Sequence, residues 1–255
     1  MRVASLFISA CLFLSQSAVQ TATPVQRDPQ AVALLQTSVQ AMGGTAPTAS
    51  LAMGDIVTVA GSLNSTGTIR ILTRGTDQTS EQIQTSSSFT RVYSRGRASI
   101  TTGGSLSTLP MESAVTTQSS CFPLPFLSAA LANPDTAFKY IGLETLNGSS
   151  VQHIQFWNTF ASIPDLQPLA NLSHRDIWVD ATSGLPQRVS FASRSSDRSG
   201  SSVPVDVLLS DYRNTNGILY PFSIQVSVNG TPWATISIQN VTLNSGLDDS
   251  SFLVQ

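Results

Sequence analysis

Alternation of apolar and polar residues is the feature that most limits what this chain can fold into. It is clearest near the C-terminus, where Ile224, Val226 and Val228 alternate with serine and glutamine, and where Ile236 and Ile238 alternate with threonine, serine and glutamine. Successive side chains of a β-strand point to opposite faces of a sheet, so a period of two predicts strands with one apolar and one polar face. We therefore expect a mainly β protein of the α+β class.

Similar segments, separated by turn residues, extend along most of the chain, although those in 76–118 are weaker and rich in serine and threonine. A meander, in which consecutive strands are neighbours, is the simplest topology for this pattern. The expected strands and hairpins lie at 55–63, 66–75, 80–85, 89–96, 97–103, 138–158, 177–191, 204–213, 220–230 and 234–244.

The hairpin at 177–191, IWVDATSGLPQRVSF, has the clearest turn. Gly184 takes a positive φ at little cost, and Pro186 favours extended chain before the return strand. Val189 and Phe191 share one face of that strand, opposite Arg188. The apolar face of such a sheet must be covered, because exposing it whole would leave a large apolar patch.

Two helices are predicted to cover it. The first occupies 28–43, where Asp28 is an N-cap, Pro29 fits the first turn and Gly43 suits the left-handed C-terminal position. The second is a short helix within 119–138, preceded by a loop that contains Pro123 and ending before Pro134. The residues that recur at helical spacing in the first helix are Ala31, Leu34, Leu35, Val39 and Met42.

The N-terminus predicts export. Arg2 is followed by an apolar run from Val3 to Leu14, which is too short to span a membrane and has the form of a secretory signal peptide. We expect a signal peptide at 1–22, cleaved between Ser17 and Ala22, and a single domain at 23–255, in a periplasmic or secreted protein. A less favoured alternative makes Cys11, in the sequence ISAC, the lipidated first residue of an outer-membrane lipoprotein.

Charge excludes one class of partner. Charged residues make up 11% of the chain, against roughly 25% in typical soluble proteins, and the formal net charge is −2. No cluster of lysine and arginine is present to neutralise several phosphates, so we expect no nucleic-acid binding.

Catalytic signals are weak, and we expect no enzyme, no metal and no cofactor. His153 and His174 are the two histidines of the chain, and neither has a neighbour at metal-ligand spacing. The sequence contains no Gly-x-Ser-x-Gly elbow, although a triad assembled from distant residues stays open. Asp248 and Asp249 provide too few oxygens for calcium and are predicted to form a polar turn before a last strand.

Cys121 and the tryptophans each allow two interpretations. Cleavage of the signal peptide would leave Cys121 as the one thiol, more often a small buried hydrophobe than a reactive nucleophile. Trp157, Trp178 and Trp233 would indicate carbohydrate binding if they shared one exposed surface, and core packing if they lay beneath helices.

A pattern of residues in the second half of the chain resembles the LolA/LolB-like superfamily of periplasmic lipoprotein carriers. The pattern consists of a Trp-x-Asp strand, a Ser-Gly-Leu-Pro turn, a basic return strand and a tail with tyrosine, glycine, proline, asparagine and phenylalanine. The matching residues are Trp178, Asp180, Ser183, Gly184, Leu185, Pro186, Arg188, Tyr212, Gly217, Pro221, Asn244 and Phe252.

This resemblance implies a curved antiparallel sheet that forms an incomplete β-barrel, with an N-terminal helix and a central short helix over its concave apolar face. It also implies a non-catalytic monomer that binds a lipid or the acyl chains of lipoproteins, as a carrier with transient envelope protein partners. A closed core without ligand, in an envelope sensor or a carbohydrate- or protein-binding module, is the alternative. The expected cavity residues are Ile69, Ile71, Ile154, Phe156, Val189, Phe191, Ile224, Val226, Ile236 and Ile238.

Overall fold

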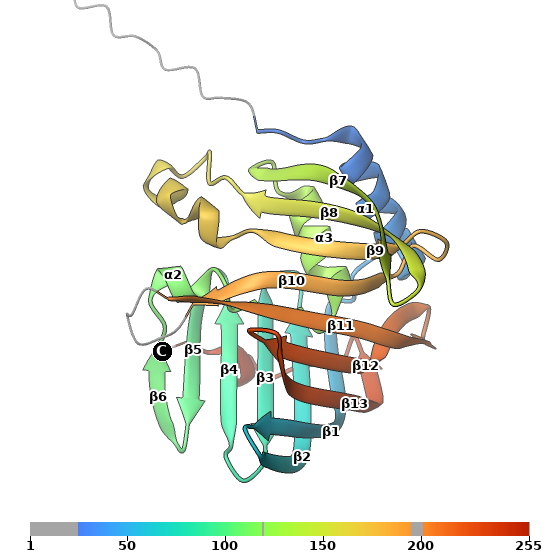
Figure 1. Ribbon diagram of the computed structural model, residues 1–255. Helices are drawn as coiled ribbons and strands as arrows, with labels where there is room; N and C mark the ends of the chain where they lie inside the picture. The colour runs from blue at the N-terminus through green and yellow to red at the C-terminus, as the bar shows by residue number, and fades with distance from the viewer. Residues whose placement is uncertain (1–24, 119, 195–200, 255) are drawn as a thin grey trace, which may run out of the picture.

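A computed structural model describes residues 25–118, 120–194 and 201–254, and within them thirteen strands form one antiparallel sheet (Figure 1). The order is β6-β5-β4-β3-β2-β1-β13-β12-β11-β10-β9-β8-β7. The first six strands are β1 (Ala49–Ala60), β2 (Leu63–Arg74), β3 (Gln78–Gln84), β4 (Phe89–Ser94), β5 (Arg97–Thr102) and β6 (Ser105–Thr108). The others are β7 (Thr136–Leu146), β8 (Ser149–Asn158), β9 (Arg175–Asp180), β10 (Pro186–Arg194), β11 (Ser202–Thr215), β12 (Ile218–Val228) and β13 (Thr231–Leu243).

The topology differs from one simple meander. Two meanders, β1–β6 and β7–β13, join where β1 pairs with β13, so that Ile56 lies opposite Ile236. The alternating pattern fixes which residues face inward, but it does not specify a partner this distant in sequence. Strands β6 and β7, although neighbours along the chain, therefore become the two edges of the sheet.

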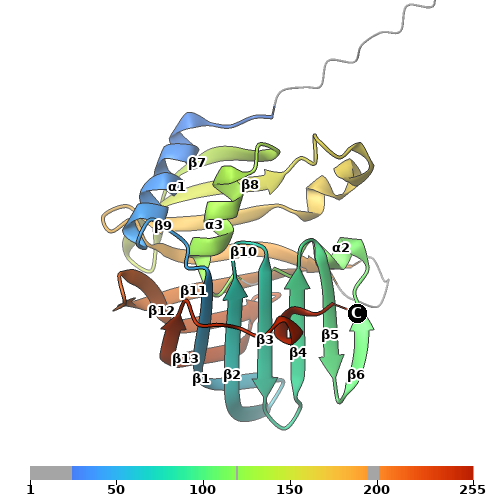
Figure 2. The same cartoon turned by 180° about the vertical axis from the view of Figure 1, so that it is seen from behind.

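The sheet is strongly curved and does not close. The strands of the first meander run across the direction of the second, so that the sheet wraps around its apolar face (Figure 1 and Figure 2). The expected incomplete β-barrel of the mainly β class is confirmed, because β6 and β7 remain edges that pair with no further strand in the described part of the chain.

Helix α1 (Pro29–Ala41) forms as predicted. The Asp28 carboxylate accepts hydrogen bonds from the amides of Gln30 and Ala31, which would otherwise have no partner in the first helical turn. At the other end, Gly43 has a φ of 121° and lies so close to the Gly217 carbonyl that a Cβ would be 2.6 Å from that oxygen. The helix thus ends against the β11–β12 turn.

The segment between β6 and β7 carries the helices α2 (Met111–Ala114) and α3 (Pro123–Ala132) from one edge of the sheet to the other. Helix α3 begins at Pro123, so the expectation that a loop would contain this proline is wrong. Proline is tolerated in the first turn of a helix, where its missing N–H would have had no partner. Figure 2 shows α1 and α3 side by side over the strands β7–β9, as the covering helices of the expected fold.

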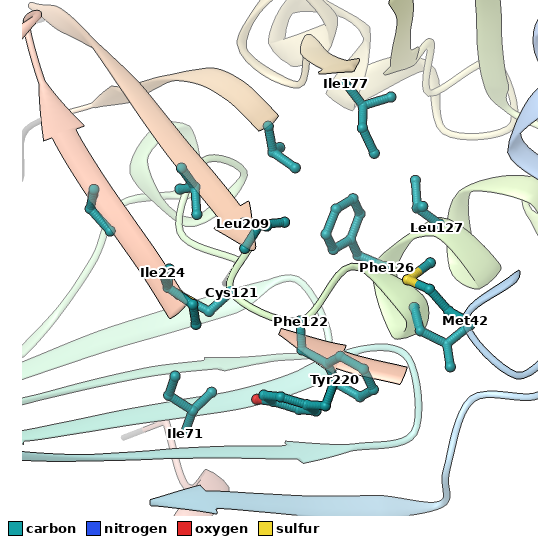
Figure 3. Close-up of a cluster of buried hydrophobic side chains, with 14 of the residues drawn as sticks. Met42, Ile71, Cys121, Phe122, Phe126, Leu127, Ile177, Leu209, Tyr220 and Ile224 are labelled. Atoms are coloured by element: carbon teal, nitrogen blue, oxygen red, sulfur yellow. The ribbon is translucent and has the colours of Figure 1, made fainter. Parts of the chain in front are cut away.

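The interior is an apolar cluster to which both helices and strands of both meanders contribute. Figure 3 shows Phe126 of α3 and Ile177 of β9 among the side chains of this cluster, and the ring centroids of Phe122 and Tyr220 lie 4.4 Å apart. Most residues on the apolar faces predicted from alternation are buried, and Ile224 and Ile236 are no more than 2% exposed. Burial of these faces is the main source of stability of the sheet.

The C-terminal tail packs on a different part of the sheet. A last strand was expected after Asp249, but the tail forms a short 3-10 helix, η2 (Asp249–Phe252), that contacts β3 and β4. Phe252 is 2% exposed, and the Arg74 guanidinium lies over its ring and pairs with Asp249. Because β1 is already paired on both sides, the tail has no sheet edge beside it and is held by these side chains instead.

The predicted signal peptide at 1–22, its cleavage region and Cys11 lie outside the described residues. Each described helix is too short or too polar to span a membrane.

Replacing Gly54 by alanine tests the β1–β13 pairing. A Cβ at Gly54 would lie 2.3 Å from the carbonyl oxygen of Ser237 and 2.8 Å from the Cα of Ile238, so backbone would have to move. We expect Gly54→Ala to lower the free energy of unfolding by at least about 2 kcal/mol in urea titrations. Gly246→Ala, where a Cβ meets nothing within 4 Å, should stay within about 0.5 kcal/mol of wild type. Equal stability of the two variants would contradict a tight pairing at this position.

Candidate functional site

A cavity of about 260 Å³ lies beside the inner helix α3, where the open edge of the sheet meets the 3-10 helix η1 (Pro164–Leu172). Its wall is mainly apolar, with Phe126 and Ala129 from α3, Phe156 and Trp157 from β8, and Leu169 from η1. The connection that carries α3 between the two sheet edges therefore forms one side of this cavity, and the second meander forms another. The first meander closes it with Thr76, Asp77 and Tyr93, so the wall includes one carboxylate.

A second cavity, of about 50 Å³, lies inside the barrel between β2, β3 and the strands β10–β13. Four of the expected ligand-binding residues line it, namely Ile69, Phe191, Val226 and Ile236. Phe156 lines the cavity beside α3 instead. The remaining five, which line neither cavity and are buried in the apolar cluster, are Ile71, Ile154, Val189, Ile224 and Ile238.

The ten expected residues thus lie in one connected interior, but most of them pack against protein. The interior is largely filled where the strands curve most, and open space remains at its end beside α3. The role of these ten side chains in binding a ligand stays a prediction.

Arg175, which the sequence interpretation missed, lies in the wall of the cavity beside α3. It is the first residue of β9 and shares the inward face with Ile177 and Val179. Its register places it between Phe156 of β8 and Phe191 of β10. The signal was present in the sequence, since Arg175 occupies the apolar phase of an alternating strand.

The guanidinium of Arg175 is enclosed, and the residue is only 7% exposed. It donates hydrogen bonds to the Ser120 hydroxyl at 2.7 Å and to the Gln118 carbonyl at 3.3 Å. The rings of Phe191 and Phe126 lie 4.9 and 5.8 Å from its central carbon. Among the described residues, no carboxylate forms an ion pair with it.

Burial has an electrostatic consequence for this group. Loss of water around the guanidinium lowers the pKa of Arg175 to about 10, and the nearby Tyr93 phenol offsets part of that effect. The arginine remains charged at neutral pH, because this value lies well above 7. A charged group in an apolar wall without an opposite charge is destabilising, which is unusual for a residue with a purely structural role.

A small polar group lies deeper in the interior. The Cys121 thiol donates a long hydrogen bond, of 3.7 Å, to the Glu81 carboxylate, and the cysteine is 6% exposed. The predicted buried position of Cys121 is therefore confirmed. Burial raises the pKa of the adjacent Tyr220 phenol well above its usual value, and within the described chain its hydroxyl has no hydrogen-bond partner.

The residues that carry the LolA-like pattern stabilise the fold. Asp180 accepts hydrogen bonds from the Ser183 amide and hydroxyl in the hairpin turn. The Tyr212 hydroxyl donates to the Pro186 carbonyl at 2.7 Å and so connects two hairpins. The Arg188 guanidinium stacks on the Trp178 ring.

The histidines occupy hydrogen-bonded or stacked positions. The His153 ring lies between the carboxylates of Glu144, at 2.7 Å, and Asp176, at 2.8 Å. His174 stacks on Trp157 at 4.7 Å, and partial burial lowers the pKa of its imidazole. Among the described residues, no group of three or more histidine, cysteine or acidic side chains is placed to hold a metal ion.

The three tryptophans lie in separate environments. Trp157 stacks on His174, Trp178 is 8% exposed against His153, and Trp233 lies beside Phe89 at the small cavity. They do not form the shared surface platform that would have favoured carbohydrate binding.

Comparisons with known proteins identify the fold. No family model and no curated protein matches the sequence. Among solved structures, a domain described as an outer membrane lipoprotein-sorting protein domain, from Vibrio parahaemolyticus, is similar with a TM-score of 0.58, 12% identity and coverage of 88% of this chain and 96% of that one.

Two further structures are similar to the same extent. A LolA superfamily protein from Nitrosomonas europaea has a TM-score of 0.56 at 13% identity, covering 88% of this chain and 97% of its own. A DUF1329 family protein from Desulfovibrio piger has a TM-score of 0.56 at 12% identity, with the same coverage. At such low identity the similarity concerns the fold, and it agrees with the resemblance found in the sequence.

Replacing Arg175 by methionine tests whether this buried charge stabilises the protein. Methionine fills similar space without charge, and we expect the free energy of unfolding without ligand to rise by about 1–3 kcal/mol, because the desolvation of the guanidinium is removed. Arg74→Met, which loses the contacts with Asp249 and Phe252, should lower it by up to about 1 kcal/mol. Urea titration measures both, and marked destabilisation by Arg175→Met would show that this arginine serves mainly to hold the structure.

Proposed function

We propose that this chain, which has the LolA-like fold, is an exported protein that binds a lipid or the acyl chain of a lipoprotein in its half-barrel. The observation that carries the proposal is the cavity of about 260 Å³ beside α3, whose wall is mainly aromatic and aliphatic. Ligand sites in proteins are typically concave and apolar with a few polar groups, and this cavity fits that description.

The size of the cavity limits the ligand. Its volume lies just below the range of about 300–1,000 Å³ for small-molecule pockets, so it suits one chain better than several. Burial of a methylene group contributes about 0.8 kcal/mol, and a chain of about 14 carbons would contribute on the order of 10 kcal/mol before the costs of association. An acyl chain can therefore bind usefully without a large polar surface.

The carrier role is the finer part of the proposal. A lipoprotein-sorting domain has the same fold, and this supports a carrier that acts without catalysis in the periplasm or outside the cell. We further propose cleavage of residues 1–22, one domain over 23–255, and a monomer that contacts envelope proteins transiently. Carbohydrate binding is less well supported, because the tryptophans form no shared platform.

Filling the cavity should prevent binding. Ala129 lines the cavity and Ala132 is exposed near the end of the same helix, so tryptophan at the two positions forms a matched pair. We expect Ala129→Trp to weaken binding of a fluorescent fatty acid at least about tenfold, and Ala132→Trp to bind like wild type.

Native mass spectrometry of protein purified without detergent should show an added mass, removable by organic extraction, on wild type and Ala132→Trp only. Thermal unfolding of both variants controls for folding. Equal binding by a folded Ala129→Trp would place the ligand elsewhere, and wild type that neither carries nor takes up lipid would contradict the proposed function.

A further inference from the structure

The wall of the cavity beside α3 contains a cation whose hydrogen bonding to the described residues is incomplete. A guanidinium has five N–H donors in a fixed planar arrangement. Arg175 uses donors on two of its nitrogens, toward Ser120 and Gln118, and no other described residue accepts from it. Arg175 lines the cavity, whose wall is mainly apolar and also contains the Asp77 carboxylate.

Neighbouring residues hold the guanidinium of Arg175 in position before any ligand binds. Arg175 lies in a β9 that is paired with β8 and β10, and the rings of Phe126 and Phe191 flank its guanidinium. These rings and the two hydrogen bonds hold the guanidinium in place. Binding of a ligand to it requires little ordering of the arginine, which favours affinity.

Within the described part of the chain, the charge of Arg175 is not paired: Asp77 also lines the cavity, but it forms no ion pair with Arg175. The Tyr93 phenol is the nearby titratable group that affects Arg175, and burial raises its pKa, so it stays neutral at physiological pH. A guanidinium in a low-dielectric wall gains most from an anion that forms charge-assisted hydrogen bonds with it, and carboxylate and phosphate match its geometry.

We propose that the ligand of this cavity is an acidic amphiphile, with a carboxylate or phosphate head paired with Arg175 and one hydrocarbon chain along the apolar wall. The inference rests on the proposed function and narrows it to anionic ligands. Phe126 and Phe156 contact the first part of the chain, and Arg175 fixes the orientation of the head.

A matched set of ligands tests the proposal on the wild-type protein alone. Palmitate, hexadecyl phosphate and hexadecanol share a chain length and differ in the head, so their displacement of a fluorescent fatty acid at pH 8 isolates the contribution of charge. We expect at least one anion to bind about 10- to 100-fold more tightly than the alcohol. Inorganic phosphate should not displace the probe at millimolar concentration.

Variants then assign the preference to Arg175. Arg175→Gln should bind all three ligands with similar affinity, close to that of hexadecanol on wild type, whereas Arg175→Lys should keep part of the preference. Arg188→Gln, which removes a guanidinium bonded to Asp206 instead, should behave like wild type. Circular dichroism and thermal unfolding establish that each variant is folded.

The outcomes separate this inference from the proposed function. Equal binding of palmitate, hexadecyl phosphate and hexadecanol by wild type would overturn the anionic head while leaving acyl-chain binding intact. A preference that survives in a folded Arg175→Gln would overturn the role of Arg175. Displacement by inorganic phosphate would indicate a site for free anions, and failure of all three ligands to bind would overturn both proposals.

Discussion

Pairing of β1 with β13 is the constraint on which the rest of the structure depends. It joins two meanders distant along the chain and makes β6 and β7, which follow one another in sequence, the two open edges of the sheet. The chain between them must then cross from edge to edge, and this crossing carries α2 and α3. The cavity beside α3 is a consequence, because a short helix covers the open side of the half-barrel without filling it.

Arg175 differs in kind from the rest of the interior. The apolar cluster stabilises the fold by burial, whereas an enclosed guanidinium that forms no ion pair with any described carboxylate opposes it. Its hydrogen bonds reach Ser120 and Gln118, in the segment that crosses the open side, so the cation lies where the sheet meets its cover. The proposed acidic ligand would supply the partner that this guanidinium lacks among the described residues. The cavity beside α3 and the buried charge of Arg175 lie in the same region of the fold.

The sequence predicted local features well and distant ones poorly. The cap at Asp28, the hairpin turn at Gly184 and the apolar faces of the later strands are set by neighbouring residues, and each is present in the structure. The helix that begins at Pro123 was misjudged, because proline is compatible with both a loop and a first helical turn. Arg175 was not predicted, because alternation of apolar residues identifies the inward face of a strand but does not show that a charged residue on that face is buried.

The sequence by itself determined which face of each strand is apolar, where most turns fall and that helices would cover the sheet, because steric and hydrophobic preferences of this kind act within a few residues. Only the tertiary structure decided that β1 lies beside β13, that the tail packs on β3 and β4, and that open space remains beside α3. These features depend on contacts between segments far apart in the chain. The same is true of Arg175, whose enclosure arises from three strands and a crossing segment together.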